Sequence, residues 1–274
     1  MSYITEATNG MKLAEHLDTG KFRTVLLPFW HGVGDVVMVL PIVEKLRELY
    51  PHIEFSLGLC RGLDQEKFVP GAVLLDGDWR EKALTLGFDL VFPINFPLER
   101  IDDLTKTKAE VSCEVEIGIP PVCGHVPIGA KKLVGVCFQC TSVPWMANAD
   151  LEVAEKIWND IKEAGYVPIE TQFIHCFANP DNQLYSFVDA HVRGCPAKLE
   201  TLMALLSSCH AFIGTVGGNF HLALSILGPD RVMLLEKDLK REHFTKENIA
   251  IANLKDYQGE VKKWLSRNLI QQTN

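Results

Sequence analysis

The chain of 274 residues lacks several features that would assign it to a membrane, a secretion route or a polyanion. No apolar run reaches the roughly 18 residues that a membrane-spanning helix requires. The first twenty residues are mixed in charge and contain no apolar core of a secretory signal. Lysine and arginine number 27 against 35 acidic residues, so the net charge of −8 disfavours broad binding to nucleic acid. We therefore expect a cytoplasmic protein.

A metal-binding cysteine pattern is also missing. Cys137 and Cys140 form a C-x-x-C pair, but no second pair with matching spacing follows among the eight cysteines. In a chain without a secretory signal, scattered cysteines in apolar contexts are expected to be reduced and buried. The sequence therefore predicts no metal site.

Patterns typical of strands and helices alternate along the chain, which favours an α/β fold with parallel sheets. Continuous apolar strands such as 21–30 are typical of a sheet that is covered on both faces. The predicted strands are 21–30, 53–60, 72–77, 88–96, 133–140, 166–173, 211–216 and 230–236. The predicted helices are 36–51, 150–165, 199–210, 219–227 and 259–272. Pro41 is expected near the first turn of its helix, where proline is tolerated.

A change of composition divides the chain into two predicted domains. Residues 117–132 are rich in proline and glycine and lack periodicity, as linkers do. We predict Rossmann-like domains at 1–128 and 129–274, with a final helix that can pack back on the first domain. Such domains place a ligand cleft at the carboxyl ends of their strands.

The first candidate site is the loop HGVGDVV, residues 31–37, where a strand leads into a helix. Gly32 and Gly34 allow close approach of the backbone to a ligand such as a donor substrate. Asp35 has two interpretations. It is either a charge that stabilises the helix N-terminus or a general base that takes a proton from a hydroxyl group.

The second half contains further candidate ligand-binding residues. Gly217 and Gly218 leave strand 211–216, and Asn219 opens a helix whose free N–H groups suit a diphosphate. The other candidates are Thr141 and Ser142 after strand 133–140, His221 in the same helix, His175 after strand 166–173, and Lys237 after the last strand. Most of these have a structural alternative. The two hydroxyls can cap the next segment, His221 can be a buried core histidine, and Lys237 can belong to a solvated charge run.

Two segments resemble a known family. VGDVVMVLPIVEKLRELYP, residues 33–51, resembles the opening of the heptosyltransferases, bacterial lipopolysaccharide enzymes with the two-domain glycosyltransferase-B fold. Residues 198–235 resemble their donor-binding segment of a helix, a strand, a glycine followed by a histidine, and an alanine-rich helix. The order and spacing agree over most of the chain.

This resemblance implies an inverting, metal-independent glycosyltransferase that uses a nucleoside-diphosphate sugar as co-substrate and needs no cofactor. Asp35 matches the proposed base of the family. The residues that match positions around the donor nucleotide are Thr141, Ser142, Gly217, Gly218, Asn219 and His221. The acceptor stays open between a glycan, a lipid-linked glycan and a small molecule.

The chain departs from the family at two positions, which favour a first alternative, and its compact first domain leaves a second one open. Val216 stands where the family has an acidic residue, and VPWMANAD, residues 143–150, lacks the lysine that usually follows the Thr/Ser loop. The first alternative is a non-catalytic module that binds a nucleotide or sugar. The second is a glycosyltransferase that acts on a modified nucleobase in DNA.

Overall fold

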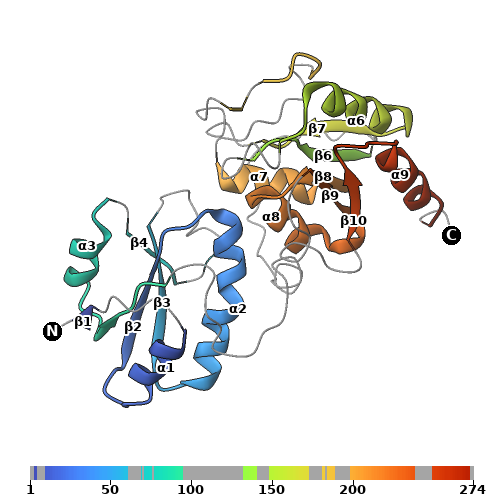
Figure 1. Ribbon diagram of the computed structural model, residues 1–274. Helices are drawn as coiled ribbons and strands as arrows, with labels where there is room; N and C mark the ends of the chain where they lie inside the picture. The colour runs from blue at the N-terminus through green and yellow to red at the C-terminus, as the bar shows by residue number, and fades with distance from the viewer. Residues whose placement is uncertain are drawn as a thin grey trace. The chain divides into compact units, whose positions relative to one another are not determined.

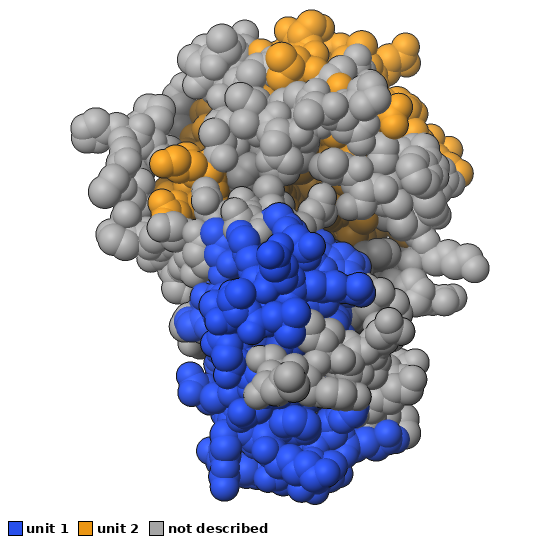
Figure 2. Space-filling view, turned by 90° about the vertical axis from the view of Figure 1, so that its left-hand side faces the viewer, with its two compact units in different colours: residues 1–106 blue, residues 107–274 orange. Residues whose placement is uncertain are grey.

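The computed structural model describes residues 3–4, 10–60, 69, 71–75, 77–94, 132–140, 148–172, 181–182, 184–188, 198–237 and 249–271. The chain divides into two compact units, Met1–Lys106 and Thr107–Asn274 (Figure 2). The predicted domain boundary between residues 128 and 129 lies outside the described residues. No helix of the described ranges combines the length and the hydropathy needed to cross a membrane.

The first unit contains a parallel five-stranded sheet with the order β1-β5-β2-β3-β4 (Figure 1). Its elements are β1 Tyr3–Ile4, α1 Gly10–Leu17, β2 Thr24–Phe29, α2 Val33–Leu49, β3 Glu54–Leu59, β4 Val73–Leu74, α3 Trp79–Thr85 and β5 Leu90–Val91. From β2 the chain proceeds to β3 and β4 on one side, and β5 lies on the other side of β2. The carboxyl end of β2 is therefore a topological switch point, where ligands bind in sheets of this kind.

The start of α2 differs from the prediction. The carbonyl of Gly32 accepts hydrogen bonds from the N–H groups of Asp35 and Val36, so the helix begins at Val33 rather than at residue 36. Pro41 consequently lies inside the 17-residue helix and not near its first turn, which corrects the sequence-based expectation. The earlier start also brings Asp35 into the first helical turn.

The second unit contains another parallel five-stranded sheet, with the order β10-β9-β8-β6-β7. Its elements are β6 Leu133–Cys137, α6 Leu151–Glu163, β7 Val167–Glu170, α7 Leu199–Ser207, β8 Ala211–Thr215, α8 Gly218–Leu227, η4 Pro229–Arg231, β9 Val232–Glu236, β10 Ala250–Asn253 and α9 Glu260–Gln271. Strand β7 lies on one side of β6 and β8 on the other, so this sheet has its switch point between β6 and β8.

Alternating residues of the second sheet pack on opposite faces, as the two-residue period of a strand requires. Val134 and Val136 belong to the cluster that includes residues of α6 and α9, whereas Leu133 packs with Leu205 of α7. Helices therefore cover both faces, and the continuous apolar strands follow from this arrangement. The α/β fold class with two parallel sheets is confirmed.

The last helix packs within its own unit. Val261 and Leu265 of α9 are fully buried beside Ile157 and Ile161 of α6, and the two helices lie side by side (Figure 1). Lys262 contributes an ion pair of 2.7 Å to α6 through Glu163. These contacts place α9 against α6, while the predicted packing on the first domain stays untested.

Candidate functional site

Asp35 lies at the switch point of the first sheet. It is in the first turn of α2, which begins four residues after β2 ends, and its side chain is 28% exposed. The orphan N–H groups of a helix N-terminus favour a negative charge at this position. The structure therefore gives Asp35 both properties that the two sequence interpretations require, namely a helix-start position and access to solvent.

His31 is the neighbour that the sequence reasoning did not identify. Its Nδ1 atom lies 3.9 Å from an Asp35 carboxylate oxygen, one helical turn away in sequence. The imidazole ring also packs against Phe29, with the ring centroids 5.0 Å apart. The order His-x-x-x-Asp across a strand-to-helix turn was the available signal. Gly34, the predicted donor contact, is buried within the same turn.

The N-terminus of α8 occupies the equivalent place in the second unit. Gly217 caps the helix without a side-chain hydrogen bond, and the N–H of His221 donates to the carbonyl of Gly217. The N–H groups of the residues between them are the ones that a helix leaves without intrahelical partners. A Cβ atom on Gly217 would stand 3.6 Å from the Cβ of Cys140, so this turn adjoins the loop after β6.

Buried polar side chains are concentrated at this end of the second sheet. Within the described ranges, the first unit has one polar side chain buried to below a tenth of its surface, Ser56, and the second unit has eight. The eight follow or end β6, β7 and β8 or lie in α8 and one loop: Gln139, Glu170, Thr171, Gln172, Asn182, Thr215, Asn219 and His221. Buried polar groups are costly unless they are bonded, so their concentration marks a site rather than a core.

Asn219 connects two of these elements. Its amide nitrogen donates a 2.7 Å hydrogen bond to the carbonyl of Thr171, which directly follows β7, and lies 3.6 Å from the sulfur of Cys137. Cys137 in turn lies 3.0 Å from Gln172 Oε1. The side chain of Asn219 thus joins the start of α8 to the ends of β6 and β7, and it is 7% exposed.

Thr215 and His221 are further polar groups at this edge. The hydroxyl oxygen of Thr215, the last residue of β8, is buried without a hydrogen-bond partner among the described residues. His221 is 4% exposed, and its ring packs edge-on against Phe220 at 5.5 Å. Such an unpaired buried hydroxyl is unusual, and it stands at the end of the strand that leads to the N-terminus of α8. Val216, at the position where an acidic residue was expected from the resemblance, is buried.

A closed hydrogen-bond ring fixes the loop after β6. The N–H of Cys140 donates to Asn148, the amide of Asn148 donates to Asn182, and the amide of Asn182 donates back to the carbonyl of Cys140, over 2.7, 2.7 and 3.3 Å. Cys140 directly precedes the predicted donor residues Thr141 and Ser142. Those two residues and His175 lie outside the described residues.

Lys237 and Tyr185 complete the described surroundings. Lys237, at the end of β9, donates to Asp150 at 2.8 Å and to the carbonyl of Asn148 at 3.4 Å, so it reaches across to the loop before α6. Tyr185 donates to the carbonyl of Ala149. Burial raises the pKa of the Tyr185 hydroxyl, and the nearby groups Cys137, Glu170 and Asp150 raise it further, so the hydroxyl keeps its proton and remains a donor.

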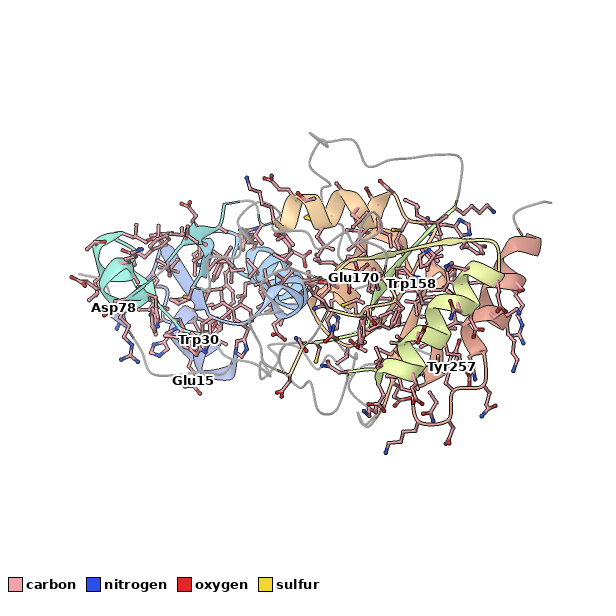
Figure 3. The ribbon with its side chains drawn as sticks, turned by 90° about the horizontal axis from the view of Figure 1, so that it is seen from above. Glu15, Trp30, Asp78, Trp158, Glu170 and Tyr257 are labelled. Atoms are coloured by element: carbon pink, nitrogen blue, oxygen red, sulfur yellow. The ribbon has the colours of Figure 1, made fainter. Side chains whose placement is uncertain are left out.

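Figure 3 labels Glu170, the last residue of β7, and Trp158 of α6. Within the described part of the chain, no group of three histidine, cysteine or acidic side chains is arranged to hold a metal ion. The sequence identified the glycine-rich turn and Asp35. It did not identify Thr215, Gln172 or the hydrogen-bond ring of Cys140, Asn148 and Asn182, because their significance depends on which strand ends are neighbours.

Solved structures with the same fold are found at low sequence identity. An E. coli ADP-heptose LPS heptosyltransferase II matches with a TM-score of 0.62 and 12% identity over 92% of this chain and all of that one. A family 9 glycosyl transferase from Veillonella parvula matches with a TM-score of 0.59 and 14% identity, over 84% of this chain and 85% of that one. The E. coli heptosyltransferase WaaC with ADP-2-deoxy-2-fluoro heptose matches with a TM-score of 0.55 and 12% identity, over 91% of this chain and 98% of that one.

No protein-family model and no curated protein sequence matches the chain. At 12–14% identity the structural matches establish the fold, and they cover 84–92% of this chain. The resemblance to heptosyltransferases that segments 33–51 and 198–235 predicted is therefore confirmed in three dimensions: this chain has the heptosyltransferase-like α/β fold.

Proposed function

We propose that this protein is a glycosyltransferase that moves a sugar from a nucleoside-diphosphate donor to an acceptor hydroxyl group. The observation that carries the proposal is the second unit's switch point, where the N-terminus of α8 meets a cluster of buried polar side chains. Its support is the fold shared with heptosyltransferases, one of which was solved with a nucleotide-sugar analogue. A helix N-terminus at such a point suits the diphosphate of a donor.

The donor half of the reaction follows from the properties of α8. When the bond between the anomeric carbon and the diphosphate oxygen breaks, negative charge builds on the departing diphosphate. The free N–H groups at Gly218 and Asn219 and the positive end of the helix stabilise that charge. The Thr215 hydroxyl adds a hydrogen-bond donor at the same edge of the sheet. Thr141, Ser142, His175, His221 and Lys237 are the remaining proposed donor contacts.

The acceptor half depends on Asp35. Its carboxylate takes the proton from the acceptor hydroxyl while the hydroxyl oxygen attacks the anomeric carbon on the face opposite the leaving group, so the configuration inverts. The partly exposed side chain at the end of β2 suits contact with an external substrate. Because the helix dipole and hydrogen bonds take the leaving-group charge, we propose that the reaction proceeds without a metal ion.

A donor panel tests this proposal. The purified protein is incubated with nucleotide sugars that differ in base and sugar, with and without mixed glycan acceptors, and released nucleoside diphosphate is measured in the presence and absence of a chelator. Transferase activity predicts release that depends on both donor and acceptor and survives chelation. Donor binding without release would instead support a non-catalytic module, and loss of activity on chelation would contradict metal independence.

A further inference from the structure

Two tryptophans from different elements lie against each other at the carboxyl end of the first sheet. Trp30 directly follows β2, and Trp79 is the first residue of α3; their ring centroids are 6.1 Å apart and their planes are inclined by 20°. Figure 3 labels Trp30 and also Asp78, the residue before Trp79. Both tryptophans are partly exposed. Two large aromatic rings that both keep part of their surface accessible at one place can contact a ligand.

The two rings do not form a closed stack. Rings stacked face to face in van der Waals contact are separated by about 3.5–4 Å, whereas these ring centroids are 6.1 Å apart with the planes inclined by 20°. Part of each ring therefore stays uncovered by its neighbour, and the pair presents an aromatic surface.

Trp79 is held in place by its surroundings. Its ring packs beside a buried cluster that includes Leu75 and Ala83, and the Arg80 guanidinium carbon lies 5.4 Å from the ring centroid. Asp78 caps α3 by accepting hydrogen bonds from the N–H groups of Arg80 and Glu81. A ring fixed by the helix start on which it sits loses little freedom when a ligand packs on it.

The aromatic surface leads to Asp35. Trp30 neighbours His31 in sequence, with ring centroids 6.2 Å apart, and His31 lies 3.9 Å from the carboxylate of Asp35. The three side chains thus form a continuous path from Trp79 through Trp30 and His31 to the proposed base. All of them belong to the first unit, and Trp30 and His31 directly follow β2, whose carboxyl end is the switch point of the sheet.

We propose that Trp30 and Trp79 form the acceptor platform, and that the acceptor group packed on it is a sugar ring. The inference rests on the proposed function, because it assigns the ring that carries the hydroxyl group delivered to Asp35. The electron-rich face of an indole attracts the positively polarised C–H groups on the less polar face of a sugar. A nucleobase would also stack on tryptophan, but the net charge of −8 disfavours a nucleic acid strand.

Binding without a donor tests the platform independently of catalysis. Neutral di- and trisaccharides are titrated into the full chain, and binding is measured by calorimetry for the wild type, Trp79→Ala, Trp79→Phe and Trp264→Phe. Trp264 is one of the five tryptophans and lies on α9 in the second unit, so it is the matched control. We expect Trp79→Ala to raise the dissociation constant about tenfold, Trp79→Phe to raise it less, and Trp264→Phe to leave it unchanged.

Several results would overturn the platform. If Trp79→Ala binds every saccharide as tightly as the wild type does, the acceptor packs elsewhere. If the wild type binds no saccharide at all, a sugar-ring acceptor is refuted. Tighter binding of a short single-stranded oligonucleotide than of any saccharide would favour the nucleobase alternative. Thermal unfolding and nucleoside-diphosphate binding of each variant are recorded in parallel: unchanged donor-dependent transfer in Trp79→Ala would refute the platform alone, whereas absence of transfer in the wild type would refute the proposed function.

Discussion

The amide nitrogen of Asn219 donates a 2.7 Å hydrogen bond to the backbone carbonyl of Thr171. This bond joins the first turn of α8 to the residue after β7, across the end of β6 that lies between β7 and β8 in the sheet. Because both groups are buried, the bond fixes where the helix N-terminus points. The nucleotide-binding role predicted for Asn219 is therefore proposed to reside in its backbone N–H group rather than in its amide.

Replacing Asn219 by leucine separates these two roles. The substitution leaves the buried Thr171 carbonyl without its partner, and we expect it to lower the free energy of unfolding by about 1–3 kcal/mol. Denaturant unfolding measures that change, and calorimetry with nucleoside diphosphates measures binding on the folded fraction. Full stability combined with lost nucleotide binding would show that the amide itself contacts the ligand.

Alanine at Gly217 should affect the ligand and not the fold. The backbone there is extended, with φ of 161°, and an added Cβ would make only an ordinary 3.6 Å contact with Cys140. We expect stability within about 0.5 kcal/mol of the wild type and weaker binding of nucleoside diphosphates, because the methyl group stands at the helix N-terminus. Unchanged binding would argue against a diphosphate at this turn.

Gly214, which lies in β8 three residues before Gly217, provides the contrasting case. A Cβ at this position would lie 2.6 Å from the fully buried ring of Phe212 and 3.2 Å from the carbonyl of Cys137. Gly214→Ala should therefore destabilise the protein by about 1–3 kcal/mol through overpacking. A tolerated substitution, judged by denaturant unfolding, would mean that the β6–β8 pairing is looser than described.

Lys237 and Asp150 offer a matched pair of substitutions. Their ion pair is partly exposed, and such pairs contribute about 0–1 kcal/mol, so Lys237→Ala and Asp150→Ala should both fold normally. If Lys237 binds donor phosphate, Lys237→Ala raises the KM for the donor, whereas Asp150→Ala leaves the lysine in place and does not raise it. Equal KM values for both variants and the wild type would reduce Lys237 to a structural contact.

His210 should make the stability of the second unit depend on pH. Burial lowers the pKa of the His210 imidazole below its ordinary value of about 6.5, and nearby Lys132 and Arg231 lower it further. As pH falls below about 6.5 the unfolded chain takes up the proton first, so stability decreases on acidification. His210→Phe keeps a ring against Tyr166, whose ring lies 5.4 Å away, and removes this proton. Between about pH 8 and pH 5.5, the free energy of unfolding should fall less for His210→Phe than for the wild type. Parallel curves of stability against pH for the two proteins would contradict the assignment.

Most of the fold was predictable because the local signals were strong. The apolar period of residues 150–165 and the glycine at its end predicted a helix, which the structure ends at Glu163, with Gly165 at a φ of +85°. The strand and the helix on either side of Gly217 lie within two residues of their predicted bounds. Helices α1 and α3 and strand β10 were not predicted. These elements are 8, 7 and 4 residues long, and a segment of that length gives the apolar period too few residues to be recognised.

The site was only partly predictable, for a different reason. Asp35 and the glycine pair can be found because turn chemistry is local. The contact between Asn219 and Thr171, or between Trp30 and Trp79, joins residues about 50 positions apart, and no single-sequence pattern records such a pairing. Strand order decides which loops meet, and that order depends on long-range packing.

Transfer by an Asp35→Asn variant tests the central claim most directly. Asparagine keeps the size and polarity of the side chain at the helix start but cannot accept a proton in this role. The proposed mechanism predicts that turnover falls by about 10²–10⁴-fold while nucleoside-diphosphate binding and the unfolding midpoint stay close to those of the wild type. Turnover within a few-fold of the wild type, at equal donor binding, would contradict Asp35 as the base.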